Sequence, residues 1–166
     1  MQTEFNALDD SSRIWIYQSD RKINTSEQKA ILSTALDFMT KWAAHGQDLK
    51  ASATIEHDQF LIIGTDESFN VASGCSIDSS VHFVQQLGEN YGIDFFDRMK
   101  LAFLMNNEVK IVPLNELKSQ IADEHLNAES QFFNNTITTK GDLNEKWLVN
   151  SGNSWLKRYF KLQESV

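Results

Sequence analysis

The sequence predicts a single α+β domain, in which helices pack on a mostly antiparallel β-sheet. Short apolar runs rich in β-branched and aromatic residues alternate with two longer stretches whose apolar residues recur every three or four positions. Two pairs of the short runs are separated by only two residues, the spacing of antiparallel hairpins. The 166 residues are enough to bury a core without disulfide bonds.

The first strand and the first helix follow a polar segment. Residues 1–12 are aperiodic and predict a loose N-terminal tail, and residues 13–18 are apolar on both faces, as a covered strand should be. Thr25 and Gln28 have the spacing of a capping box, and the apolar residues after them repeat at helical intervals. Gly46 is predicted to end this helix in the left-handed position.

Two strands and a second helix come next. Residues 51–56 and 59–64 flank His57-Asp58, which predicts a tight hairpin. The apolar spacing from Ile77 onward predicts a second helix that ends at Gly92 or earlier at Gly88.

The last part of the predicted core is another hairpin. Residues 100–105 and 108–112 read as strands joined by a primed turn at Asn106-Asn107, and Pro113 should end their ladder. A short helix is expected to start near Asn115.

The order of the first six elements is that of the ferredoxin-like βαββαβ arrangement, with the seventh as an extra edge strand. Residues 13–125 should therefore form the α+β core, with both helices on one face of the sheet and with Trp15 and Tyr17 on the open face. Residues 126–166 carry many aromatic side chains and are predicted to form a C-terminal extension that packs on the core.

Composition limits the function. A net charge of −8 argues against nucleic-acid binding, and no apolar run approaches the roughly 20 residues of a membrane helix. One cysteine and an N-terminus without signal-peptide features indicate a cytoplasmic protein. No zinc-ligand or phosphate-cradle motif is present, so we expect no metal, no cofactor and no ATP hydrolysis. The partner, a small molecule or a protein, stays unknown, and a homodimer stays open.

The best candidate site is the crossing from the apolar strand into the second helix, because a helix start exposes backbone N–H groups. Cys75 is either an activated nucleophile at that helix start or a small buried residue, and His45 is the candidate base from outside. Ser76 either holds an anion with its neighbours or simply caps the helix, the second being favoured because Asp78 would repel an anion. Asp66 and its neighbouring acids are either Mg²⁺ ligands or solvated loop residues. The proposed ligand-binding set is Gly74, Ser76, Asp78, Ser79 and Asp66.

Four segments resemble an uncharacterised family of short Bacteroidetes proteins, whose members often carry the label "ABC transporter ATPase". They are residues 13–21 (RIWIYQSDR), 42–51 (WAAHGQDLKA), 72–81 (ASGCSIDSSV) and 91–98 (YGIDFFDR). The resemblance covers nearly the whole chain and implies no established activity. The label conflicts with the residues, because the chain has no Walker A lysine and is shorter than a transporter ATPase domain.

Two functions from different classes follow as expectations. The first is a small-ligand or catalytic pocket at the turn of residues 74–80, with His45 nearby. The second is a non-enzymatic protein-interaction domain that uses the open sheet face or the aromatic C-terminal segment.

Overall fold

A computed structural model describes residues 1–164, with side chains up to Phe160. It confirms the predicted α+β class, with helices and antiparallel sheets in one chain. The chain divides into two compact units. The first unit comprises residues 1–97 and 138–141, and the second comprises residues 98–137 and the chain from 142 onward. Each unit has its own sheet and its own core.

The sheet of the first unit has three antiparallel strands in the order β1-β5-β4. They are β1 (Arg13–Gln18), β4 (Ala51–Glu56) and β5 (Phe60–Thr65), and β5 lies in the centre because it pairs with both others along its whole length. The predicted turn at His57-Asp58 is confirmed, with φ of 52° and 56° at these two residues. Every residue of β5 is buried, as its unbroken apolar run indicates.

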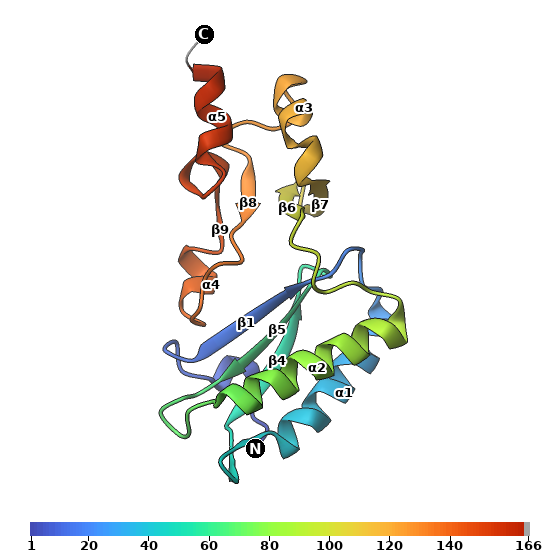
Figure 1. Cartoon of the computed structure of the whole chain (residues 1–166), viewed down its shortest axis with the longest axis vertical. Coiled ribbons are helices and arrows are strands. Elements are labelled where there is room, and N and C mark those ends of the chain that lie inside the picture. Colours follow the sequence, from blue (N-terminus) through green and yellow to red (C-terminus); the bar gives the residue numbers. More distant parts are fainter. Residues whose placement is uncertain (165–166) are drawn as a thin grey trace. The chain divides into compact units, whose positions relative to one another are not determined.

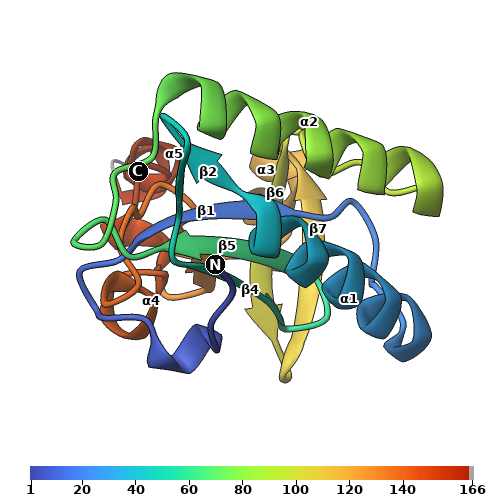
Figure 2. The same ribbon diagram turned by 90° about the horizontal axis from the view of Figure 1, so that it is seen from below.

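Two long helices, α1 (Thr25–Lys41) and α2 (Gly74–Tyr91), cover one face of this sheet (Figures 1 and 2). Phe38 of α1 stacks on Phe83 of α2 with ring centroids 4.5 Å apart. The prediction that Trp15 and Tyr17 point away from the helices is wrong: Tyr17 belongs to the core that contains both helices, and Trp15 packs edge-on against Trp42 at the end of α1. Trp15 and Tyr17 do lie on the same face of β1, but that face packs against the helices and is not the open one.

The ends of α1 differ from the sequence prediction. The N-cap is Asn24 and its capping-box partner is Glu27, one residue before the expected pair. The helix ends at Lys41, because Trp42 is extended (φ −71°, ψ 127°). His45 and Gly46 form the two-residue turn of a small hairpin between β2 (Ala43–Ala44) and β3 (Gln47–Asp48), with φ of 53° and 76°. Gly46 is thus a turn glycine and not the end of the helix.

The N-terminal segment is not the loose tail expected. Gln2 forms a parallel bridge with Ala51 of β4, and the residues that follow make the 3₁₀ turn η1 (Phe5–Ala7). Leu8 is buried against Gly64, where a Cβ atom would lie 2.9 Å from Leu8 Cδ1. Gly64 is therefore required by close approach, and residues 5–8 cover part of the sheet face opposite the helices.

A strap from much later in the sequence, residues 138–141, closes the outer edge of β1. Thr139 forms an antiparallel bridge with Arg13. The Ile14 N–H donates to the Thr138 carbonyl at 2.9 Å, and the Lys140 N–H donates to the Ser12 carbonyl at 2.9 Å. In the expected ferredoxin-like order this edge would belong to the strand at 100–105. That expectation is wrong, because the strand pairs elsewhere.

The second unit is built on a four-stranded antiparallel sheet in the order β7-β6-β8-β9. The predicted hairpin at 100–112 is confirmed as β6 (Lys100–Met105) and β7 (Glu108–Pro113), with Asn106 and Asn107 both at positive φ. Two three-residue strands, β8 (Gln131–Phe133) and β9 (Leu148–Asn150), complete the sheet from the segment predicted as an extension.

Short helices surround this second sheet. They are η2 (Leu114–Glu116), α3 (Leu117–Ala122), α4 (Asp142–Glu145), η3 (Ser151–Asn153) and α5 (Lys157–Glu164). The core combines apolar residues of β6, β7 and α3 with Phe132, Leu156 and Phe160. The predicted boundary at residue 125, between core and extension, does not coincide with the boundary between the two units. Residues on both sides of position 125 belong to the core of the second unit. None of the described helices is long and apolar enough to cross a membrane.

Candidate functional site

The start of α2 is a capped helix terminus. Ser73 is the N-cap, and its Oγ accepts the Ser76 N–H at 3.1 Å, while Ser76 Oγ accepts the Ser73 N–H at 2.7 Å. Ser76 is therefore the buried third residue of the capping box and not the N-cap expected. Its carbonyl also accepts a hydrogen bond from Trp42 Nε1 at 2.8 Å, which ties α2 to the end of α1. Ser76 is thus a structural residue, because its side chain caps α2 and its carbonyl binds the Trp42 indole.

The remaining predicted site residues on α2 face outward. Cys75 and Asp78 are exposed on the first turns, and Gly74 is the first helical residue. Ser79 Oγ donates to the Ser76 carbonyl at 3.1 Å. His45 lies exposed in the β2–β3 turn, and the described structure contains no hydrogen bond between it and Cys75. The predicted catalytic pair is thus not brought into contact by a hydrogen bond.

The loop between β5 and α2, residues 66–73, is hereafter called the anchor loop. Asp66 is buried, and its Oδ1 accepts the Ser68 N–H at 3.0 Å and the Ser68 hydroxyl at 2.6 Å. Asp66 Oδ2 lies 3.8 Å from Lys50 Nζ. Glu67 Oε2 accepts the Ala72 N–H at 3.0 Å. The acids proposed as Mg²⁺ ligands are therefore used to shape the loop itself.

A single amide side chain ties the anchor loop to the neighbouring β2–β3 hairpin. Asn70 Nδ2 lies within hydrogen-bond distance of three carbonyl oxygens, those of Ala44 (3.4 Å), Gln47 (3.1 Å) and Asp48 (3.3 Å). Together with the bonds of Asp66 and Glu67, this fixes the loop at its beginning, middle and end.

The two residues on either side of Asn70 are apolar and exposed. Phe69 has 56% of its surface accessible and Val71 has 60%, although the loop that carries them is fixed by hydrogen bonds. Single exposed apolar residues are common, but a fixed loop that presents two of them, one aromatic, is a feature of binding surfaces.

The surroundings of the anchor loop are acidic. Residues 43–50 and 64–80 contain four carboxylates, Asp48, Asp66, Glu67 and Asp78, and one basic residue, Lys50. Because Lys50 is paired with Asp66, the other three carboxylates of these segments have no lysine or arginine counterpart from the same segments. Among the described residues, no group of three or more His, Cys, Asp or Glu side chains gathers where it would hold a metal ion.

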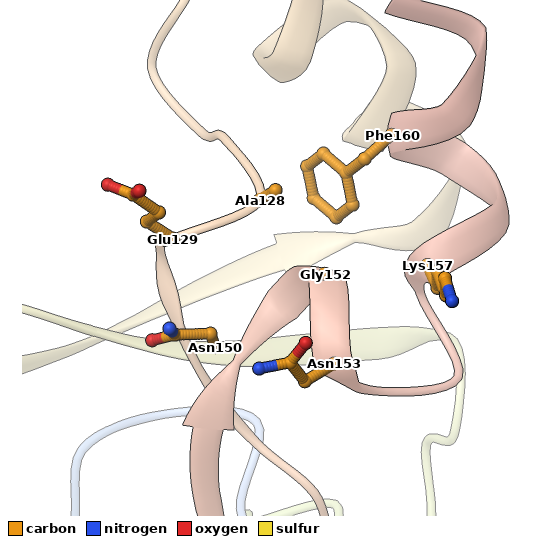
Figure 3. Close-up of a pocket in the computed structure, with 7 residues that line it drawn as sticks. All are labelled: Ala128, Glu129, Asn150, Gly152, Asn153, Lys157 and Phe160. Carbon is orange, nitrogen blue, oxygen red and sulfur yellow. The ribbon is translucent and has the colours of Figure 1, made fainter. Parts of the chain in front are cut away.

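The second unit contains a cavity of about 240 Å³ that the sequence did not indicate (Figure 3). It lies where the turn before β8 meets η3 and the first two turns of α5. Its lining residues come from these three segments: Ala128, Glu129, Asn150, Gly152, Asn153, Lys157 and Phe160.

The chain matches no protein-family model, and comparisons with curated proteins and with solved structures find no match either.

The sequence indicates the crossing at residues 64–80 as a site, but it does not indicate the exposed apolar residues of the anchor loop. The serines of 72–80 satisfy the helix backbone: Ser73 and Ser76 form the capping box, and the hydroxyls of Ser79 and Ser80 donate to carbonyls three residues earlier. The sequence does not predict that Phe69 and Val71 are exposed, because exposure of an apolar residue depends on tertiary structure. A signal was present, since two apolar residues separated by one asparagine interrupt an otherwise polar loop.

Proposed function

We propose that this protein is a non-enzymatic interaction domain that binds a partner protein through the anchor loop. The observation that carries the proposal is the exposure of Phe69 and Val71 on a loop fixed by the side chains of Asp66, Glu67 and Asn70. The site overlaps the region that the sequence indicated, but the residues that contact the partner differ.

Fixing the loop before binding favours affinity. Ordering a flexible side chain or loop at an interface costs roughly 0.5–1.5 kcal/mol for each immobilised side chain. Here the backbone on both sides of Phe69 is already held, so that cost falls mainly on the partner. An aromatic anchor of this kind commonly contributes about 2 kcal/mol or more when it enters a pocket.

The charges around the anchor loop select the type of partner. Asp48, Glu67 and Asp78 give the loop and its neighbouring segments a negative charge, so a complementary surface has an apolar pocket bordered by lysine or arginine. A second copy of this chain is a poor partner for the same surface, because two such loops would bring like charges together. We therefore assign the site to a different protein with a basic, apolar surface.

Photo-crosslinking tests this assignment. A photoreactive phenylalanine analogue is placed at position 69, and the same analogue at position 155 serves as the control, since Trp155 is also exposed (46%) but lies in the second unit. Position 69 should capture a protein that position 155 does not capture. The captured protein, once purified, should bind Phe69→Ala at least about tenfold more weakly than the wild type, which corresponds to about 1.4 kcal/mol. Trp155→Ala should bind like the wild type.

Three outcomes would contradict the proposal. Equal capture at both positions would show that crosslinking at position 69 reflects exposure of the analogue and not a specific contact. Crosslinks solely between copies of this chain would replace the partner by a homodimer. Unchanged binding by Phe69→Ala at unchanged melting temperature would remove the anchor function of the loop.

A small-ligand or catalytic site at residues 74–80 is the second candidate, and the exposure of Cys75 on the first turn of α2 favours it. The two candidates are separated by comparing Cys75→Ser with Phe69→Ala. A site that uses the thiol loses function in the first variant, whereas a protein-docking loop loses binding in the second.

A further inference from the structure

We propose that the outer edge of β1 is a binding site for the strap, residues 138–141 (TTKG), of a second copy of this chain. The chain's own strap occupies this site, and the strap of a second copy has the same sequence. Exchange of straps between two copies therefore forms between chains the contacts that the structure contains within one chain. The site is separate from the anchor loop, and the proposal does not depend on the function assigned to that loop.

The strap lies as an antiparallel strand on one short segment of the first unit. Thr139 forms an antiparallel bridge with Arg13. Three backbone hydrogen bonds, each 2.9 Å long, join the strap to this segment: Ile14 N–H to the Thr138 carbonyl, Lys140 N–H to the Ser12 carbonyl and Gly141 N–H to the Asp10 carbonyl. Residues 10–14 thus carry the whole ladder. Main-chain hydrogen bonds of this kind give an added strand its affinity.

The side chain of Lys140 enters surroundings that suit an ammonium group. Its Nζ donates to the carbonyls of Asn6 at 3.1 Å and Leu8 at 2.6 Å, and it lies 5.9 Å from the centre of the Phe5 ring. Carbonyl oxygens and the face of an aromatic ring both attract a cation. Residues 4–10 also contain three carboxylates and no lysine or arginine. A strand with a neutral residue in place of the lysine would lose these interactions.

Gly141 adds a requirement for a residue without a side chain. A Cβ at this position would lie 3.3 Å from both the Cβ and the carbonyl oxygen of Asp10, which is closer than ordinary van der Waals contact. The site therefore selects a lysine that is followed directly by a glycine. Residues 140–141 are the only Lys-Gly pair in the sequence, so a second copy can offer the site only its own strap.

The strap can leave the edge of β1 without unfolding the first unit. All four of its residues are exposed or half-buried, so hydrogen bonds and the ammonium group hold it, and apolar burial does not. The chain on both sides of the strap belongs to the second unit, so the strap joins the first unit as an isolated segment of four residues. Segments with few buried apolar contacts open locally at a small part of the global free energy of unfolding.

The protein concentration decides which copy supplies the strap. The site forms the same contacts with either strap, but a tethered segment acts at an effective concentration in the mM range. Dilute protein should therefore keep its own strap. Exchange should become substantial as the concentration of the chain approaches about 1 mM.

Disulfide trapping between full-length chains tests this exchange. Both chains carry Cys75→Ser, and one adds Arg13→Cys while the other adds Thr139→Cys, so neither chain can form a disulfide within itself. The antiparallel bridge places positions 13 and 139 opposite each other, at a separation that a disulfide spans. The two chains are mixed at about 1 mM and oxidised with glutathione disulfide, and the mixed dimer is measured by mass spectrometry.

Glu145→Cys in place of Thr139→Cys is the matched control, because Glu145 is exposed and lies on α4, outside the strap. The mixed dimer should form at least about tenfold more with the cysteine at position 139 than with the cysteine at position 145. Addition of Lys140→Met to the Thr139→Cys chain should lower its yield. Equal yields for positions 139 and 145, or a yield that Lys140→Met leaves unchanged, would overturn the proposal.

A peptide titration gives a second measurement that needs no cysteine variant. The probe is the peptide TITTKGD, residues 136–142, blocked at both ends, and the receptor is the ¹⁵N-labelled full chain with Lys140→Met and Gly141→Val, which weaken its own strap. The amide resonances of residues 10–14 should shift and saturate. The wild-type chain, whose own strap fills the site, should bind the peptide at least about tenfold more weakly, as should the variant with a peptide that has methionine in place of lysine. No saturable shift of the variant at about 10 mM peptide, or equal binding of the two peptides, would overturn the proposal.

Discussion

Ser12 and Ser19 are two buried serines of the first unit that differ in the state of their hydroxyl groups. Ser19 Oγ lies 2.6 Å from the Arg21 carbonyl and 2.8 Å from the Gln59 carbonyl, so it has acceptors on two segments. Ser12 Oγ is buried and has no hydrogen-bond partner among the described residues. A buried hydroxyl without a partner is a cost to the folded state.

The two serines should therefore respond in opposite ways to removal of the hydroxyl. Ser19→Ala should lower the free energy of unfolding by about 0.5–1.5 kcal/mol, because it removes a buried hydroxyl that hydrogen-bonds to the Arg21 or Gln59 carbonyl, while the Gln59 carbonyl keeps the Ser19 N–H as a donor. Ser12→Ala should leave that free energy unchanged or raise it by about 1 kcal/mol. Urea denaturation of both variants measures the difference. Equal losses would show that the Ser12 hydroxyl has a partner in solution.

At this scale the sequence shows local chemistry better than exposure. The turn at His57-Asp58 and the helix stop at Gly92, where φ is 63°, were predictable because each depends on a few adjacent residues. The exposure of Cys75 and Phe69 was not predictable, because it depends on which distant segments cover them. The candidate site was consequently found by position, while its contact residues were missed.

At the scale of elements, Arg21 joins the start of α1 to the end of α2. Its Nη1 and Nη2 donate to the two carboxylate oxygens of Glu27 at 2.9 Å and 2.7 Å. Nη2 also donates to the carbonyl of Tyr91, the last residue of α2, at 2.6 Å. Glu27 accepts a hydrogen bond from the Asn24 N–H in the capping box as well. The hydrogen bonds from Arg21 and then from Asn24 lower the pKa of Glu27 to about 2 from its ordinary value of 4.5.

This lowered pKa predicts how stability depends on pH. The folded-state pKa lies below that of the unfolded chain, so the contribution is complete above about pH 4.5 and is lost as the pH falls through about 2. Glu27→Gln should therefore be less stable than the wild type at neutral pH. The difference in stability between the two proteins should become smaller as the pH falls from 4.5 to 2. Thermal unfolding across this range measures the gap.

Asp37→Asn is a suitable control for this measurement. Asp37 is an exposed carboxylate of the same helix that makes no ion pair or hydrogen bond among the described residues. The stability difference between Asp37→Asn and the wild type should not change between pH 4.5 and 2. A gap for Glu27→Gln that stays constant down to pH 2 would contradict the assigned pKa.

Most elements were predictable from their periodicity, but their assignment to sheets was not. The strands at 13–18, 51–56 and 100–105 appear where expected. Which strand pairs with which depends on contacts far apart in sequence, and β6 takes β8 as its second neighbour in place of β1. Three-residue strands such as β8 and β9 are too short to show alternation, so nothing in the pattern pointed to the second sheet.

At the scale of the whole molecule, the strap at residues 138–141 makes one unit depend on a late part of the chain. Lys140 Nζ donates to the carbonyls of Asn6 (3.1 Å) and Leu8 (2.6 Å). These bonds add to the backbone hydrogen bonds that the strap forms with Ile14 of β1 and with Ser12 just before it. A charged donor held by two carbonyls is a stronger tie than a neutral backbone bond.

Removing this donor should loosen the outer edge of β1. In Lys140→Met, the amide proton of Ile14, which donates to Thr138, should exchange with solvent at least about tenfold faster than in the wild type. Lys146→Met is the control, because Lys146 is exposed and its ion pair among the described residues is with Asp142, four residues away. Hydrogen exchange followed by NMR measures both. An unchanged rate at Ile14 in Lys140→Met would show that the strap does not depend on the ammonium group.

The strap also has a consequence for biosynthesis. Residues 1–97 leave the ribosome before residues 138–141, and the 44 residues from 98 to 141 take about 2–9 s to make at roughly 5–20 residues per second. During that time the nascent chain presents the outer edge of β1 without its partner. Such an edge is a template for pairing with another strand, including that of a neighbouring nascent chain on the same messenger RNA. Until residue 141 emerges, pairing of this kind competes with closure of the β1 edge by the strap.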